Sequence, residues 1–463
     1  MTAWYDKAIF YHMYPLGMTG APFANPYPVS DGTADGTRDV SSDSRMDELM
    51  QWIPYLESLH ISAIYIGPLF ESSTHGYDTR DFRLIDRRLG PNVSFRSFVD
   101  CCHEHGIRVV VDGVFNHTGR EFFAFRDLQA HRDQSPYAGW YRNVNFGWGS
   151  PLGDSFGYES WHGIWELPCL NHKNPEVRNY LLDTVRFWVQ EFDIDGIRLD
   201  CAGDLSFEFM QELRRLANEI KPEFWLMGEV IHGEYARWVN PQMLHSVTNY
   251  EMHKSIYSAH NDHNYFELAH NVRRLEAVGR DLYTFVDNHD EDRIASKLLN
   301  PAHLAPLYTL LFTLPGIPSI YYGSEFGIEG KKEWGSDWPL RPCLELEDYK
   351  DALTTNPVTS VYAALGKLKA EEPALTWGEF KELHLTTQCY AYARVLDGEA
   401  LVAVLNNGDS PAQLEFQLPV EASGVEDLLA DCVGSQPILT QVEWGKLKVQ
   451  LPSNYATLLR LIG

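Results

Sequence analysis

Three acidic residues stand at the ends of three separate apolar runs. Asp200 closes IDGIRLD, Glu229 follows FWLMG, and Asp290 closes YTFVDNHD. An extended run of Ile, Leu, Val and Phe predicts a buried strand, and an acid at its end must face water or a ligand. A nucleophilic carboxylate together with a protonated carboxylic acid is the set of groups that cleaves a glycosidic bond. The sequence therefore indicates several carboxylates directed at one substrate.

The elements that must position these acids alternate along the chain. The stretches between the strand-like runs carry apolar residues at three- and four-residue spacing, which predicts amphipathic helices. Four of these stretches lie at 46–59, 94–106, 177–192 and 207–220. The predicted strands lie at 8–15, 62–68, 108–116, 193–200, 224–230, 246–252, 283–290 and 319–325. Because strands that alternate with helices pair in parallel, eight such units close into an α/β barrel whose strand ends open onto one face.

A long connection and a change of pattern set off two further regions. About fifty residues rich in Gly, Trp, Tyr, Asn and Pro separate the third strand from its helix, and a loop of that length in a compact domain is usually functional. After about residue 375 the apolar and polar residues alternate between short turns, which predicts an antiparallel β-sandwich. We therefore predict an α/β fold with a (β/α)8 TIM barrel at 1–116 and 172–374, a loop subdomain after strand 3 at 117–171, and a C-terminal antiparallel β-sandwich at 375–463.

Composition narrows the class of protein. With 463 residues, 44% of them hydrophobic, the chain can bury a large core. Its formal net charge of −26 argues against nucleic acid or an anionic membrane surface as a partner. We see no apolar stretch long enough to span a bilayer and no secretory signal. The seven cysteines are scattered and include no CxxC pair, so we expect reduced thiols in a cytoplasmic protein.

Seven short motifs follow one another along the chain. They are HGYD at 75–78, DGVFNH at 112–117, LPCLN at 167–171, GIRLD at 196–200, GEV at 228–230, FVDNHD at 285–290 and GIPSIYYGSEFG at 316–327. In this order the sequence resembles the α-amylase superfamily, glycoside hydrolase family 13, over essentially its whole length. Its pattern is most similar to intracellular members that hydrolyse maltooligosaccharides and cyclomaltodextrins and have no N-terminal domain.

The resemblance implies a role for each of the three acids. Asp200 matches the nucleophile, Glu229 the acid/base, and Asp290 a stabiliser of the transition state. Retaining hydrolysis needs two carboxyl groups about 5 Å apart. Arg198 shares a strand face with Asp200, so its guanidinium can keep Asp200 ionised. Glu229 needs a raised pKa, which burial and neighbouring carboxylates would supply, and Asp290 would act on the developing positive charge.

Further positions match residues that bind the substrate in this family. The resemblance implies that His117 and His289 hydrogen-bond the sugar before the scissile bond, with the Tyr77 ring stacked beneath that sugar. It also implies that Asp112 holds Arg198 and shapes the site. The histidines could instead be structural hydrogen-bond donors.

A pair beyond the eighth strand fits two interpretations. Asp337 and Arg341 have the DxxxR spacing of the family's pair on the non-reducing side of the substrate. Residues at i and i+4 can also form an ordinary surface ion pair.

The sequence departs from calcium-dependent relatives. Many secreted α-amylases carry Lys-His shortly after the nucleophile, in support of a calcium site, whereas the segment after Asp200 reads CAGD. One metal candidate remains in SDGTADGTRD, where alternating oxygen ligands suit a hard cation. Its ligands would be Asp31, Thr33, Asp35 and Asp39, although a solvated acidic turn fits the same residues. We expect no required cofactor, with a structural calcium at this loop as the alternative.

The resemblance implies a retaining α-glucoside hydrolase with an oligosaccharide substrate. It would cleave α-1,4 bonds of maltooligosaccharides and starch-derived dextrins, and cyclodextrins are further candidates. Three alternatives remain open on the same barrel: an α-1,6-glucosidase, a transglycosylase, and a non-catalytic carbohydrate-binding protein. The sequence leaves the oligomeric state open.

Overall fold

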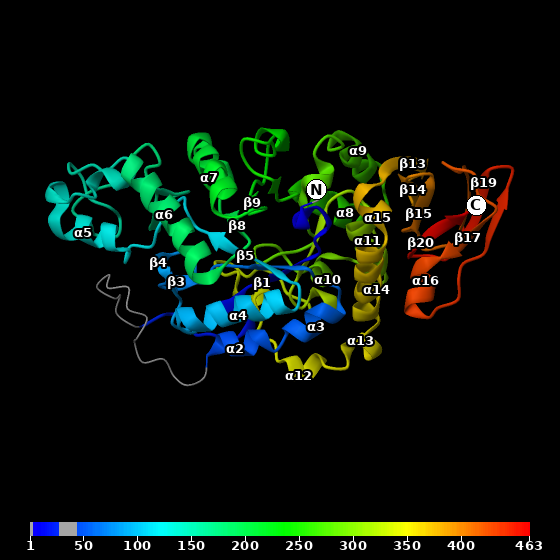
Figure 1. The fold of residues 1–463 in the computed structure, drawn as a ribbon, viewed down its shortest axis with the longest axis horizontal. Coiled ribbons are helices and arrows are strands. Elements are labelled where there is room, and N and C mark those ends of the chain that lie inside the picture. Colours follow the sequence, from blue (N-terminus) through cyan, green and yellow to red (C-terminus); the bar gives the residue numbers. More distant parts are fainter. Residues whose placement is uncertain (1–2, 27–43) are drawn as a thin grey trace.

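A computed structural model describes residues 3–26 and 44–463 of the chain (Figure 1). A central parallel barrel has C-terminal antiparallel strands at one end, coloured orange to red, and an inserted region with helix α5 (Phe123–His131) at the other. The barrel and the C-terminal antiparallel sheets confirm the predicted fold class.

Eight parallel strands form the barrel, and each lies inside or beside one of the runs predicted from the sequence. They are β1 (Phe10–Met13), β2 (Ala63–Ile66), β5 (Arg108–Gly113), β8 (Gly196–Leu199), β9 (Trp225–Gly228), β10 (Ser246–Val247), β11 (Tyr283–Thr284) and β12 (Ile317–Tyr321). Their order is β10-β9-β8-β5-β2-β1-β12-β11. A parallel bridge between Thr248 and Tyr283 joins the two end strands, so the barrel closes.

The predicted strands were too long, above all the sixth and the seventh. The run at 246–252 ends as a strand at Val247, because the Asn249 side chain accepts a 3.1 Å hydrogen bond from the Met252 amide and caps helix α8. In the run at 283–290, the Asn288 side chain accepts from the Asp290 amide at 2.9 Å. Side-chain bonds of this kind replace the strand ladder with turns.

Aromatic side chains fill the interior of the barrel. Phe10, Tyr65, Trp225 and Tyr283 belong to one buried cluster, and the Phe10 and Trp225 rings stack with centroids 4.8 Å apart. The barrel interior is therefore a packed core, and a substrate must bind at the ends of the strands.

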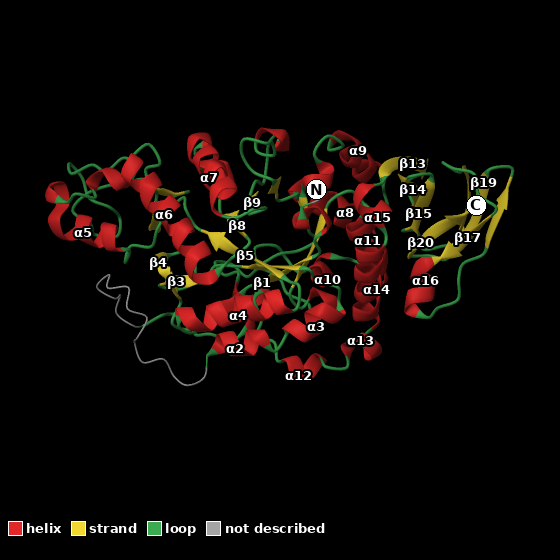
Figure 2. Cartoon of the chain, in the orientation of Figure 1, coloured by secondary structure: helices red, strands yellow, loops and turns green. Residues whose placement is uncertain are grey.

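Helices cover the outside of the barrel (Figure 2). The longer ones are α4 (Asn92–Glu104), α6 (Pro175–Phe192), α7 (Phe207–Ile220), α8 (Tyr250–Asn261), α9 (Phe266–Arg274), α11 (Leu304–Thr313) and α14 (Pro357–Glu371). Shorter ones are α1 (Pro15–Met18), α2 (Arg45–Met50), α3 (Ile53–Ser58), α10 (Ile294–Lys297), α12 (Leu346–Tyr349), α13 (Ala352–Thr355) and α15 (Pro373–Trp377). The connection from β9 to β10, which the structure describes in full, carries a short 3-10 helix at Tyr235–Arg237 in place of a covering α-helix.

Two small hairpins extend the barrel at its substrate-facing end. They are β3 (Phe70–Ser72) with β4 (Thr79–Ile85), and β6 (Ser160–Trp161) with β7 (Ile164–Pro168). Trp188 of α6 is fully buried, donates a 2.6 Å hydrogen bond to the Phe82 carbonyl and stacks on Phe70 at 4.3 Å. Because Tyr77 lies in the turn of the first hairpin, Trp188 helps to hold that tyrosine over the barrel.

The C-terminal region consists of two packed antiparallel sheets. One contains β13 (Glu379–Leu385), β14 (Cys389–Leu396), β15 (Glu399–Asn406), β17 (Gly424–Asp427) and β20 (Tyr455–Ile462), and the other contains β16 (Ala412–Gln417), β18 (Thr440–Glu443) and β19 (Lys446–Leu451). Helix α16 (Leu428–Val433) follows β17. Alternate residues of β15 face opposite ways: Leu401, Ala403 and Leu405 pack in the barrel-side core, whereas Val402 and Val404 pack between the sheets.

All seven cysteines are free thiols. Among residues 3–26 and 44–463, no helix combines the length and the apolar character needed to cross a membrane.

Replacing Trp188 with Phe should lower the free energy of unfolding by roughly 1–3 kcal/mol, because the buried Phe82 carbonyl loses its donor while the ring stacking persists. Trp188→Ala should cost roughly 3–5 kcal/mol. Urea denaturation measures both values. The matched control is Arg186→Ala on the exposed side of the same helix, which should stay within roughly 0.5 kcal/mol of the parent. Equal effects of Trp188→Phe and Arg186→Ala would contradict the assigned role.

Candidate active site

Three acids from three strand ends gather on one face of the barrel. Asp200 follows β8 directly, Glu229 follows β9 directly, and Asp290 lies in the loop after β11. One carboxylate oxygen of Asp200 and one of Glu229 lie within 4.8 Å of each other. This closeness suits direct attack by one carboxylate and proton transfer by the other, as in a retaining pair.

A single guanidinium holds three carboxylates together. Arg198 donates from Nη1 to Asp112 Oδ1 at 3.0 Å and to Asp200 Oδ1 at 2.8 Å, and its Nη2 lies 3.0 Å from Glu229 Oε1. The strand register builds this contact, because Asp112 of β5 is the direct neighbour of Arg198 in β8. The Tyr65 hydroxyl donates to Asp112 Oδ2 at 2.8 Å and fixes its other oxygen.

Burial raises the pKa of both Asp200 and Glu229 above the ordinary range, and Arg198 opposes the rise at each. The two carboxylates also raise each other's proton affinity by repulsion, since three negative groups share one cation. Glu229 Oε2 accepts the Cys201 amide at 3.0 Å, and the Tyr250 hydroxyl lies 3.4 Å from Glu229 Oε1. The pKa of each of these two carboxyl groups therefore lies above that of a free carboxyl group.

Asp290 is held in its ionised form. Burial alone would raise its pKa, but His289 and the Arg341 guanidinium outweigh it and hold the pKa of Asp290 well below the usual range. Arg341 Nη2 lies 2.9 Å from Asp290 Oδ1, and His289 Nε2 lies 3.0 Å from Oδ2. Arg341 is itself fixed, because its Nη1 donates to the Tyr14 hydroxyl at 3.1 Å.

The two residues of the DxxxR pair have different surroundings. Arg341 is 6% exposed and contacts Asp290, whereas the Asp337 side chain is 37% exposed. The two form an i, i+4 ion pair of 3.6 Å, and Lys332 Nζ also lies 3.3 Å from Asp337. The structure therefore places Arg341 in the acid cluster and Asp337 at its rim.

Two buried histidines present unpaired nitrogens near the acids. His117 Nε2 and His289 Nδ1 are buried without a hydrogen-bond partner, and so is Asp200 Oδ2. Burial lowers the pKa of His117 to about 3, so that imidazole is neutral, and burial also lowers the pKa of His289. The Tyr77 hydroxyl hydrogen-bonds His289 Nε2, and the two rings stack with centroids 5.6 Å apart. Unpaired buried polar atoms of this kind suit the hydroxyl groups of a sugar.

Several residues of the cluster were not among those predicted from the sequence. His12 of β1 is buried, its Nε2 has no partner, and its ring meets His289 edge-on at 5.1 Å. Tyr14, Tyr65 and Tyr250 donate to or contact the predicted residues through their hydroxyls. Histidines and tyrosines inside apolar runs resemble ordinary core residues, and Tyr250 lay inside a run predicted as strand.

Two sets of residues could in principle bind a metal ion, and only one of them includes catalytic acids. Asp31, Asp35 and Asp39, with Thr33, lie outside the described residues. Within the described part of the chain, one group of potential ligands comes together, formed by Asp200, Cys201 and Glu229. Arg198 already bonds both carboxylates of that group, so its guanidinium supplies the positive charge that a metal would bring.

Comparisons with known proteins show the family of the chain. Residues 27–381 match the family model described as alpha amylase, catalytic domain. A cyclomaltodextrinase from Thermoanaerobacter pseudethanolicus is 31% identical over 439 residues, which covers 92% of this chain and 74% of the relative. Neopullulanase 2 from Thermoactinomyces vulgaris is 30% identical over 473 residues, which covers 97% of this chain and 76% of the relative.

Solved structures of similar proteins share the fold of this chain. A debranching enzyme from Nostoc punctiforme superposes with a TM-score of 0.80 at 28% identity, with 99% of each chain covered. A cyclomaltodextrinase superposes with a TM-score of 0.83 at 26% identity, covering 99% of this chain and 78% of the other. The family model spans most of the chain and includes all three clustered acids, and the chain belongs to the α-amylase family of glycoside hydrolases.

Proposed function

We propose that this enzyme hydrolyses α-1,4-glucosidic bonds of maltooligosaccharides and cyclodextrins through a covalent glycosyl-enzyme. The observation that supports the mechanism is that one oxygen of Asp200 and one of Glu229 lie within 4.8 Å of each other, which is compatible with a retaining pair. The substrate class is supported by the relatives named cyclomaltodextrinase and maltogenic alpha-amylase, which are 31% and 30% identical to this chain.

In the first step, Asp200 attacks the anomeric carbon and Glu229 protonates the departing glycosidic oxygen. Oδ1 of Asp200 is engaged by Arg198 while Oδ2 has no partner, so Oδ2 is the attacking atom. The C–O bond to the leaving sugar breaks as the ester bond to Asp200 forms. In the second step, the ionised Glu229 takes a proton from water, the water oxygen attacks the same carbon, and Asp200 leaves as a carboxylate.

The groups around Asp200 and Glu229 would stabilise the charge of the transition state and hold the sugar in position. Positive charge develops on the sugar ring in each transition state, and Asp290, held ionised by Arg341, would stabilise it. His117 and His289 would bind sugar hydroxyls through their unpaired nitrogens, with Tyr77 against the face of the ring. Arg198 would stop Asp200 from taking up the proton that Glu229 must carry.

The reaction as proposed uses side chains alone, and we expect it to need no cofactor or metal ion. Two guanidiniums, Arg198 and Arg341, supply the positive charge among the acids. We also place the enzyme in the cytoplasm, where its seven free thiols would stay reduced. A relative from Bacillus subtilis named intracellular maltogenic amylase, 29% identical to this chain, supports that location.

A timed product profile tests the substrate class. Purified enzyme is incubated separately with maltoheptaose, a cyclodextrin, pullulan and isomaltose, and the early products are separated by chromatography. We expect maltose and glucose from maltoheptaose and the cyclodextrin, with the isomaltose left intact. Cleavage of isomaltose alone would contradict the α-1,4 assignment.

The addition of an acceptor sugar separates hydrolysis from transfer, since transfer products would grow at the expense of free sugar.

Glu229→Gln should separate the acid role from binding. On maltoheptaose it should reduce kcat by roughly 10²- to 10⁴-fold, because the departing oxygen loses its proton donor. A maltosyl fluoride needs no such proton, so it should still glycosylate Asp200 and release one fluoride per enzyme in a burst. Glu234→Gln, an exposed change in the same connection, is the matched control and should behave as the parent. Equal losses on both substrates would contradict the assignment.

Asp200→Asn should stabilise the fold while abolishing turnover. Burial raises the pKa of Asp200 to about 6 against 3.8 for the free side chain, so its ionised form is costly in the folded state. The cost is absent below pH of about 4, grows as the pH rises, and is complete above about 6. Differential scanning fluorimetry should therefore give a midpoint a few degrees higher for the variant at alkaline pH, with the gap closing on acidification. The exposed Asp262→Asn is the control, and a lower midpoint for Asp200→Asn at alkaline pH would refute the argument.

A further inference from the structure

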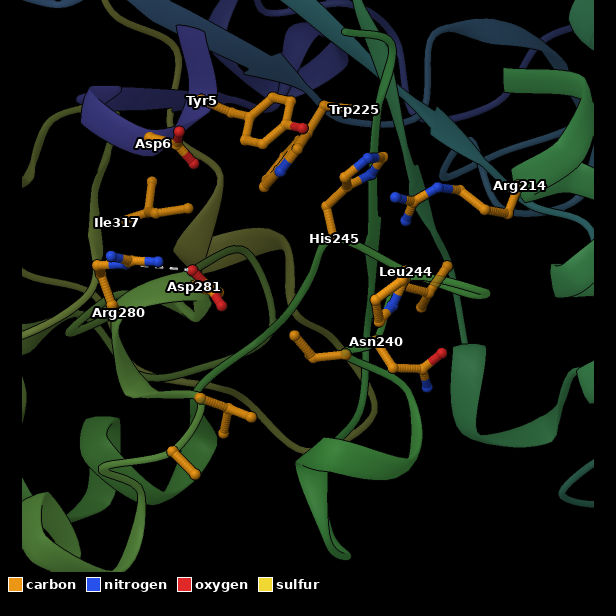
Figure 3. A pocket seen from close by; sticks show the side chains of 14 residues that line it. Tyr5, Asp6, Arg214, Trp225, Asn240, Leu244, His245, Arg280, Asp281 and Ile317 are labelled. Atoms are coloured by element: carbon orange, nitrogen blue, oxygen red, sulfur yellow. Dashed lines mark ion pairs between the residues drawn. The ribbon is translucent and has the colours of Figure 1, made fainter. Parts of the chain in front are cut away.

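A cavity of about 340 Å³ lies at the opposite end of the barrel from the acids (Figure 3). Its walls include the first residues of two strands, Trp225 of β9 and Ile317 of β12, and His245 immediately before β10. The connection between β9 and β10 has no covering α-helix, and residues of that connection form one wall. The catalytic acids follow the other ends of the strands, so this cavity is separate from the site described above.

The charged groups of the cavity balance each other. Asp6 and Asp281 stand on one side, and Arg214 stands on the opposite side next to His245 (Figure 3). Arg280 lies 3.5 Å from Asp281 and completes two acids and two bases. Because the walls carry no net charge, they favour a ligand that is neutral overall and offers both hydrogen-bond donors and acceptors.

Aromatic faces form the wall between these charged groups. The Tyr5 ring stacks against Trp225 with centroids 6.4 Å apart and meets His245 at 5.0 Å. Trp225 is fully buried and also stacks on Phe10, so the half-buried Tyr5 ring is the aromatic surface left for the C–H groups of a sugar, whose hydroxyls would bond carboxylates and guanidiniums.

One buried N–H group of this wall has no acceptor among the described residues. The buried indole nitrogen of Trp225 has no hydrogen-bond partner. His245 Nδ1 accepts the Leu226 amide at 3.0 Å, and burial together with Arg214 lowers the pKa of His245 to about 3. The imidazole is thus neutral, and its proton is on Nε2. A ligand with hydroxyl oxygens would satisfy the indole donor that the protein leaves unpaired.

We propose that this cavity is a second binding site for a neutral saccharide of one or two hexose units. The site lies at the start of β9, and Glu229 lies just beyond the end of the same strand, so the two ligands would occupy opposite ends of the barrel. The chemistry of the walls defines the ligand class, and only the choice of maltose as a probe rests on the proposed function. The observed balance of charges distinguishes such a ligand from phosphate or another anion.

Hydrogen exchange with mass spectrometry tests the proposal, with Glu229→Gln as the parent so that maltose is not consumed. Increasing maltose should slow exchange in segments 239–245 and 277–281, with half-saturation in the millimolar range. Asp281→Ala removes a wall acceptor and should weaken this protection by about tenfold. Ala277→Trp fills the rim of the cavity and should abolish it, whereas Ala302→Trp, another exposed alanine, should leave it unchanged.

Several results would overturn the proposal. Protection confined to segments around Asp200 and Asp290 would mean that maltose binds the catalytic site alone. Protection of 239–245 that survives Ala277→Trp would place the ligand elsewhere. Protection of the cavity segments by inorganic phosphate or by zwitterionic glycine, but not by maltose, would assign the cavity to an anion or a zwitterion in place of a saccharide. Turnover of maltoheptaose is measured separately, on the enzyme that retains Glu229. The catalytic proposal can therefore fail while the second binding site is confirmed, and the second site can fail while the catalytic proposal stands.

Discussion

One guanidinium shared among three carboxylates organises the catalytic face. Arg198 contacts Asp112, Asp200 and Glu229 within 3.0 Å. All four side chains are buried or nearly buried at the strand ends. Three buried negative charges around one cation leave an excess that a proton must relieve. Burial in this cluster raises the pKa of both Asp200 and Glu229, and glycosidic cleavage needs one carboxyl group that is ionised and one that is protonated.

The rest of the structure serves to keep that cluster in place. Parallel register puts Asp112 opposite Arg198, and aromatic packing in the barrel leaves the strands little freedom to shift. A second buried guanidinium, that of Arg341, pairs with one carboxylate. Arg341 donates a hydrogen bond to the Tyr14 hydroxyl and favours the ionised form of Asp290. Preorganisation of this kind costs stability, since buried charges and unpaired polar atoms are unfavourable until a substrate meets them.

The barrel presents polar groups at both of its ends, with a packed interior between them. That interior is filled by rings such as Phe10 and Trp225, which separate the catalytic face from the cavity at the opposite end. Where the connection after β9 lacks an α-helix, this opposite end has a cavity, and the buried Trp225 indole N–H in its wall has no hydrogen-bond partner. A gap in the helical layer thus creates a potential site without any change in the strands.

The sequence by itself determined the strands, the barrel and the acids at their ends. Apolar runs ending in Asp200, Glu229 and Asp290 carry a signal that is local, because a buried strand and a polar terminus can be recognised without knowing their neighbours. The contact of Arg198 with Asp200 followed in the same way, since residues at i and i+2 share a strand face.

Only the tertiary structure decided which distant groups meet. That Arg341 turns to Asp290 while Asp337 stays at the rim depends on how loops fold back over the strand ends. His12 and Tyr250 were hidden because a polar residue in an apolar run looks the same whether it packs in a core or faces a site. The sixth strand ended early because the Asn249 side chain caps a helix. The first two outcomes rest on burial and long-range contacts, which no local pattern encodes, whereas the Asn249 cap is a local signal that the strand prediction overlooked.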